Sequence, residues 1–275
     1  MSRAFKGFTL IELVAVIMVL AVVGLGGYGY LRFGSQFYVD TAAREQALNQ
    51  GRFVVERLSR ELRNAVPNSL RVSGSCIEFV PMAAAMRYLD APMSPDKGDS
   101  IKALWITPSG ATPADGDPIQ WDSGFFGSEL WVIVNPTQSG QLYSQDPGRI
   151  VPLNGSAYDK THGYYNLTLA DTVSFAKDSP SRRLYFGGQP VSFCQQGGAL
   201  YRYQGYGFQA SQPQPGAGLG DGVLMAEGLS AGNAPFSIDA PILQRNAVVH
   251  VLLRFRAISE DDMFFNLEIQ LPNVP

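Results

Sequence analysis

The chain has 275 residues, of which 45% are hydrophobic, and its 21 basic and 24 acidic side chains leave a net charge of −3. This length accommodates one large domain or two small ones, and a mildly acidic chain without a basic block does not have the composition of a nucleic-acid binder. The two cysteines lie far apart and only two histidines are present, whereas a zinc site usually needs close-set pairs of ligands, so the sequence indicates neither a metal nor a cofactor.

The chain begins with a short basic segment and a long apolar run. Arg3 and Lys6 precede residues 13–31, a stretch of 19 residues without a charge. As a helix, this stretch is roughly 28 Å long, which matches the hydrocarbon thickness of a bilayer. The basic residues before it predict an N-terminus in the cytoplasm and the bulk of the chain outside.

One carboxylate, Glu12, stands at the head of the apolar run. An ionisable group is costly to insert, by about 2.5–3.5 kcal/mol at a helix centre and less near an end. We therefore interpret Glu12 as functional, and the alternative is a side chain that merely lies at the interface. An ordinary secretory signal is disfavoured, because the basic segment ends early, in Gly7, and no small-residue cleavage site follows the apolar run.

The residues after Gly7 read FTLIEL, residues 8–13, and this motif resembles the prepilin peptidase site of type IV pilins and type II secretion pseudopilins. The resemblance implies cleavage by prepilin peptidase after Gly7, N-methylation of Phe8, and an assembly role for Glu12. In that family the glutamate pairs with the N-terminal amine of a neighbouring subunit. Because breaking such a pair costs more than forming it gains, the contact acts mainly as a register device.

The same resemblance implies partners and a location. The partners are prepilin peptidase, other major and minor pilins, an inner-membrane assembly platform and membrane lipid. The location is the inner membrane, with a single span and the C-terminal domain in the periplasm, and then the pilus at the cell surface.

Beyond the apolar run the pattern becomes amphipathic. Apolar or small residues recur every three or four positions and form one stripe, consisting of Leu48, Gly51, Val55, Leu58, Leu62 and Ala65. Charged residues fill the other faces, where the i,i+4 spacing predicts ion pairs from Glu56 to Arg60 and from Arg57 to Glu61. A proline then ends the pattern, which predicts one helix over residues 8–66.

Four glycines lie close together near the outer membrane face of this helix, namely Gly24, Gly26, Gly27 and Gly29. Each glycine costs about 1 kcal/mol relative to alanine in a helix. The cluster predicts either a weak or melted segment or close packing of helices through small residues. Both alternatives suit a subunit that leaves a bilayer for a helical bundle.

After residue 66, short apolar and aromatic runs alternate with stretches rich in glycine and proline, which predicts a β-rich head. Strands are expected near residues 76–80, 103–107, 129–135, 200–208, 247–257 and 263–271. The last two flank a polar turn and predict a hairpin. The expected fold class is α+β, a pilin-like fold in which the long helix packs on an antiparallel sheet with large loop insertions over residues 81–200.

The chain is therefore expected to comprise a leader at residues 1–7, a membrane-spanning or filament-core helix at 8–31, an amphipathic continuation at 32–66 and a head at 67–275. The head carries both cysteines, Cys76 and Cys194, which fit one structural disulfide in an oxidising compartment. In the chain-entropy model such a bond stabilises by about 4–5 kcal/mol. Two free buried thiols are the alternative.

The resemblance to pilin-like proteins extends beyond the N-terminal motif to three further segments: RFVVERLSRELRNA at residues 52–65, CIEFVP at 76–81, and residues 248–275 with their final NVP. They look like the MshO proteins, minor pilin-like components encoded with the mannose-sensitive haemagglutinin (MSHA) pilus of marine and aquatic gamma-proteobacteria. The size and the arginine-rich helix end are also similar to the J subunit of type II secretion and to the W-type minor pilins. In those relatives the subunits cluster at the filament tip and prime assembly, so the resemblance implies such a role.

The sequence contains no nucleophile elbow, phosphate loop or HExxH motif, so no enzymatic activity is expected. His250 lies between apolar residues of a predicted strand and is expected in the core or on a sheet face. Three hypotheses are compared: a structural subunit of a filament or its tip, a tip adhesin that binds a surface glycan or protein, and a membrane-anchored enzyme. The third would need clustered titratable residues, which the sequence does not show.

Overall fold

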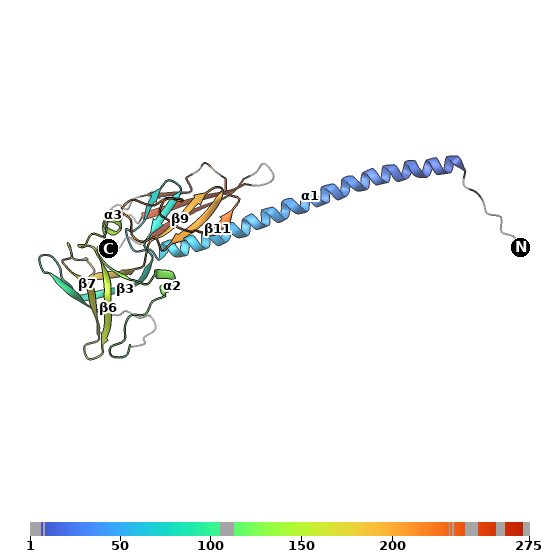
Figure 1. Ribbon diagram of the computed structural model, residues 1–275. Coiled ribbons are helices and arrows are strands. Elements are labelled where there is room, and N and C mark those ends of the chain that lie inside the picture. Colours follow the sequence, from blue (N-terminus) through green and yellow to red (C-terminus); the bar gives the residue numbers. More distant parts are fainter. Residues whose placement is uncertain are drawn as a thin grey trace. The chain divides into compact units, whose positions relative to one another are not determined.

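The computed structural model describes residues 7, 9–104, 113–230, 232, 234–239, 247–256 and 262–271. Contacts within the chain divide it into two units, residues 1–49 with 257–261, and residues 50–256 with 262–275. Helix α1, Leu10–Arg63, runs from the first unit into the second, and is drawn in blue in Figure 1. Beside α1, the second unit is built from antiparallel β-structure, so the fold is a pilin-like α+β fold, as the sequence predicted.

Helix α1 ends three residues before the predicted end at residue 66. The backbone after Arg63 leaves the helix because it pairs with the chain that follows the second strand. The Val66 N–H donates to the Val80 carbonyl, and the Met82 N–H donates to the Asn64 carbonyl, both at 2.8 Å. The proline after Val66 is therefore not the residue that stops the helix.

The glycine cluster, Gly24 to Gly29, does not interrupt α1, which is continuous through it. A Cβ atom added to any of these four glycines would meet nothing within 4 Å. The chain alone therefore shows no melted segment here. Close packing through small residues, the other alternative, requires a second chain.

The last turns of α1 bury one face against the head. The buried residues there are Gly51, Val54, Leu58, Glu61 and Leu62. Val54 is therefore more deeply buried than Val55, which the predicted stripe contained. Gly51 permits a close approach, because a Cβ atom at this position would lie 2.1 Å from the Phe265 ring.

Two open antiparallel sheets form part of the head. The larger sheet has the strand order β1-β2-β9-β10-β11: β1 (Arg71–Ser73), β2 (Cys76–Phe79), β9 (Val191–Gln196), β10 (Ala199–Gln204) and β11 (Val223–Glu227). The smaller one has the order β12-β13-β14: β12 (Phe236–Asp239), β13 (Ala247–Phe255) and β14 (Met263–Leu271). The predicted hairpin of the last two strands is confirmed by their register, from Ala247 opposite Leu271 to Phe255 opposite Met263.

Residues 81–200 form a large insertion, as predicted, but most of it is a closed barrel and not loops. Its strands, in the order β3-β4-β7-β6-β5-β8, are β3 (Met82–Asp90), β4 (Gly98–Leu104), β5 (Trp131–Val134), β6 (Ile150–Asp159), β7 (Tyr164–Val173) and β8 (Arg183–Gly187). Figure 1 labels β3, β6 and β7 of this barrel. Two short helices, α2 (Ser123–Phe126) and α3 (Ser139–Tyr143), lie in its connections.

The barrel shares a wall with the rest of the head. Successive side chains of a strand point to opposite faces, and in β5 Val132 and Val134 belong to the barrel core while Ile133 points the other way. Ile133 packs in a second buried cluster with Val66, at the end of the helix, and with Tyr185 of β8. Strands β5 and β8 therefore contribute to two apolar clusters, one inside the barrel and one at the end of the helix.

Candidate functional site

The N-terminal motif stands at the start of α1. Gly7 is exposed, Phe8 lies outside the described residues, and Glu12 lies in the first helical turn. The N–H groups of Glu12 and Leu13 donate to the Thr9 carbonyl at 3.1 and 3.2 Å. A carboxylate in the first turn is favoured by the helix dipole. The side chain of Glu12 is exposed and is directed at no described residue, so it is free to meet another molecule.

The helix that follows this motif has the character of a membrane anchor. By length and composition α1 can cross a bilayer, and none of its most apolar window is buried within the chain. Large apolar side chains are exposed along it, for example Leu10 at 82%, Leu25 at 75% and Phe33 at 72%. Such an apolar surface is unfavourable in water, so we expect lipid or another protein to cover it.

The other end of α1 holds a buried charge cluster. The Glu61 carboxylate, 7% exposed, accepts a hydrogen bond from the Arg57 Nε at 2.8 Å and from the Arg202 Nε of β10 at 3.0 and 3.1 Å. Both predicted i,i+4 pairs are present, since Arg60 also contacts Glu56 at 2.6 Å. The sequence placed Glu61 outside the apolar stripe, but its side chain is buried, because Arg202 of β10 pairs with it.

Arg202 is the residue of this cluster that the sequence did not indicate. Its side chain is 4% exposed, and its guanidinium lies 5.3 Å from the Phe125 ring centre and 6.0 Å from that of Phe193. Its Nη1 donates to the Gln204 side chain, while its Nη2 is buried without a hydrogen-bond partner among the described residues. For Glu61 a signal did exist: it lies three residues after Leu58 and next to Leu62, within the apolar stripe.

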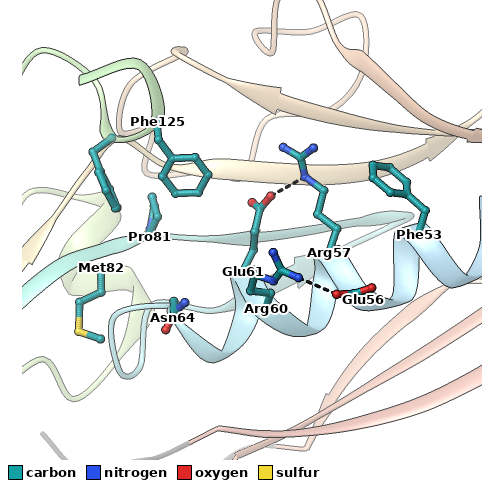
Figure 2. Close-up of a pocket in the computed structure, with 10 residues that line it drawn as sticks. Phe53, Glu56, Arg57, Arg60, Glu61, Asn64, Pro81, Met82 and Phe125 are labelled. Carbon is teal, nitrogen blue, oxygen red and sulfur yellow. Dashed lines mark hydrogen bonds and ion pairs between the residues drawn. The ribbon is translucent and has the colours of Figure 1, made fainter. Parts of the chain in front are cut away.

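A pocket of about 400 Å³ opens beside this cluster. Figure 2 shows its walls: the last turns of α1 supply Phe53, Arg57 and Glu61, and Phe125 of α2 stands above them. The lining also includes Glu56, Arg60, Asn64, Pro81, Met82 and Phe126. A concave site of this size with apolar walls and a few charged groups has the usual form of a binding site.

A second buried carboxylate lies in the larger sheet. Glu78 in β2 accepts hydrogen bonds from the Arg71 guanidinium and from the Tyr206 hydroxyl at 2.9 Å. Burial raises the pKa of the Glu78 carboxyl, and the hydrogen bond and charge of Arg71 with the Tyr206 hydrogen bond offset only part of this. Cys76, in the same strand, is bonded to Cys194 directly opposite in β9.

The remaining candidate residues do not join the pocket. His250 lies on the surface of β13, 3.3 Å from Asp239 and 3.6 Å from Glu268, which confirms its expected place on a sheet face. Within the part of the chain that the structure describes, no three His, Cys, Asp or Glu side chains are grouped to hold a metal ion.

Comparison with known proteins supports the reading of the N-terminal motif. The prokaryotic N-terminal methylation motif matches residues 2–28, the segment that contains Gly7, Phe8 and Glu12. No curated protein and no solved structure matches the chain. The motif marks structural, non-enzymatic proteins that prepilin peptidase processes and that assemble with other pilins. With its N-terminal anchoring helix and its β-rich head, the chain is a type IV pilin- or pseudopilin-like protein.

Proposed function

We propose that this chain is a minor pilin-like subunit of a type IV pilus of the mannose-sensitive haemagglutinin type, and that it acts when the pilus is initiated. The observation that carries the proposal is the methylation motif at the start of a helix whose most apolar stretch is not covered by any described residue of the chain. In this proposal prepilin peptidase cuts between Gly7 and Phe8, and the new amine of Phe8 is methylated. The helix then moves from the inner membrane into the filament.

In the filament, Glu12 supplies the charge that sets the register between subunits. Its exposed carboxylate lies in the first turn, within reach of a neighbour's N-terminal amine. In an apolar bundle either charge alone is strongly disfavoured, so a subunit that is out of register is destabilised by several kcal/mol. This pairing selects the position of the subunit more than it strengthens the filament.

The head favours a minor subunit over the repeating one. The barrel of β3 to β8 is a closed body with its own core, added between the second and ninth strands of the chain. A shaft must place such a bulky head around every helix, whereas a filament tip places it only once. The bond between Cys76 and Cys194 also favours a head folded in the oxidising periplasm.

Purified filaments test the proposal directly. We would shear pili from cells that carry the wild-type chain, Glu12→Gln or the control Glu45→Gln, and count copies of each subunit by quantitative mass spectrometry. We expect a few copies of this chain per filament, a strong loss of filaments with Glu12→Gln, and no loss with Glu45→Gln. An abundance equal to that of the main pilin would contradict a minor role.

Deletion of the chain separates pilus assembly from type II secretion, which use the same N-terminal motif. We expect the deletion to remove surface pili and to leave protein secretion intact. Loss of secretion with normal pili would instead assign the chain to the secretion system as a pseudopilin of the J class. Normal pili that no longer adhere to a glycan or protein surface would indicate an adhesin.

A further inference from the structure

Arg57 presents an unused pair of donors to the pocket of Figure 2. Its Nε is held by Glu61, and none of the residues that the structure describes accepts a hydrogen bond from its Nη1 or Nη2. In Figure 2 these two nitrogens point away from Glu61. The side chain is 37% exposed, so it is fixed at one side and open at the other. A guanidinium oriented in this way can bind a carboxylate through two parallel hydrogen bonds.

The charged side chains around Arg57 leave one positive charge that no neighbouring carboxylate neutralises. Glu61 is shared by two guanidinium groups, those of Arg57 and Arg202, and no described residue accepts a hydrogen bond from the buried Nη2 of Arg202. Glu56 is already paired with Arg60. Asp122 also lies near Arg57 and Arg202, but it is exposed and caps α2 by accepting the Gly124 N–H. The buried cluster itself therefore carries an excess of one positive charge.

The walls of the pocket indicate that the anion belongs to a protein. Phe53 is 48% exposed on a helix face that is otherwise charged, and Phe125 and Met82 line the same cavity. A free inorganic anion gains nothing from these apolar walls, whereas a carboxylate next to a bulky apolar side chain uses both features. A cavity of about 400 Å³ can take one such apolar side chain.

We propose that this pocket binds a neighbouring pilin-like subunit, through an Asp or Glu side chain that pairs with Arg57 and an apolar side chain that packs against Phe53 and Phe125. This inference rests on the proposed function, because it takes its partner from the filament. It adds a contact made by the head, separate from the contact at Glu12. Its role is to choose which subunit lies next to this one.

Site-specific photocrosslinking in cells tests the proposal on the full chain. A benzophenone amino acid would replace Phe53 in the pocket, Arg52 on the exposed face beside it, or Leu20 in the exposed apolar helix. We expect Phe53 to crosslink to a pilin-like subunit, in a segment with an acidic residue beside an apolar one. Arg52 should give no such product, and Leu20 should crosslink to pilin-like subunits whether or not the pocket is used.

Substitution of Arg57 shows whether the charge carries the contact. Arg57→Gln should lower the Phe53 crosslink at least about tenfold, since even one of the two charge-assisted hydrogen bonds accounts for a loss of that size. The matched control Arg63→Gln, at an exposed arginine of the same helix that does not line the pocket, should leave it unchanged. Arg57→Lys keeps a charge beside Glu61 but lacks the fork of donors, so it should also lower the yield. Arg57→Glu should be rescued when the crosslinked acidic residue of the partner is replaced by arginine.

The two hypotheses fail in distinguishable ways. The pocket contact alone would be overturned if Leu20 gave crosslinks and Phe53 gave none. It would also be overturned if a Phe53 product formed and Arg57→Gln and Arg57→Lys left its yield unchanged. The absence of pilin-like products at both Leu20 and Phe53 would overturn the proposed function as well. A Phe53 product in a segment without an acidic residue would contradict the chemistry proposed for the partner.

Discussion

The two ends of helix α1 each carry a glutamate, and the two differ in their surroundings. Glu12 is exposed in the first turn and has no ion-pair partner among the described residues, whereas Glu61 is buried between Arg57 and Arg202. A buried carboxylate that is fully paired serves the fold of its own chain, since removing one partner leaves an uncompensated charge. A carboxylate in an apolar segment without such a partner points to a second molecule. The comparison separates a glutamate that stabilises the fold of its own chain from one that has no partner within the described part of that chain.

The largest expected effect on stability is at Glu61. Glu61→Ala would leave the guanidinium groups of Arg57 and Arg202 without their carboxylate, so we expect the free energy of unfolding of the head to fall by about 3–5 kcal/mol. Glu56→Ala, which removes an exposed pair, should change it by less than about 1 kcal/mol. Urea unfolding of the full chain in detergent, followed by tryptophan fluorescence, measures both. Equal losses of unfolding free energy in Glu61→Ala and Glu56→Ala would contradict the distinction between the buried and the exposed ion pair.

A smaller effect is expected from two glycines of the same helix. Gly51→Ala places a methyl group against the Phe265 ring, so overpacking should destabilise the head by about 1–3 kcal/mol. Gly34→Ala adds a methyl group in open space and should leave the unfolding midpoint of the head unchanged. The same urea experiment measures this pair, and a loss at Gly34 as large as that at Gly51 would show that the comparison is wrong.

The smallest effect concerns pH and Glu78. Burial raises the pKa of this carboxyl above its ordinary value of 4.5 in the folded chain. The folded head therefore binds the proton more readily than the unfolded chain, so this group's contribution to stability decreases as the pH rises from 4.5 through the raised pKa. Glu78→Gln should remove that decrease. A wild type and a variant with parallel stability curves over this pH range would contradict the assignment.

The sequence predicted the helix well because two independent signals, an uncharged run and then an amphipathic stripe, follow one another along it. The uncharged run and the amphipathic stripe placed its body correctly, and only its last turn differed, since the backbone after Arg63 pairs with the chain beyond β2. The barrel was missed for a physical reason. Its strands are interrupted by register shifts, for example between Leu153 and Gly155 and between Tyr88 and Asp90. Such bulges let a sheet curve and close, but they break the alternation that identifies a strand.

The pocket could be predicted only in part. Glu61 could have been assigned to the buried face from its spacing to Leu58 and Leu62. Arg202 could not, because it lies 141 residues further along the chain and reaches Glu61 only through the placement of β10 beside α1. The motif at Gly7, by contrast, is read by an enzyme as a linear sequence, so it was recognisable without any structure.

The N-terminus of the mature chain tests the central claim most directly. We would isolate the protein from cells with and without prepilin peptidase and determine its N-terminal peptide by mass spectrometry. The account predicts a chain that begins with methylated Phe8 when the peptidase is present and with the intact leader when it is absent. An intact leader in both strains, or a cut after Gly29 or later, would contradict a pilin-like subunit.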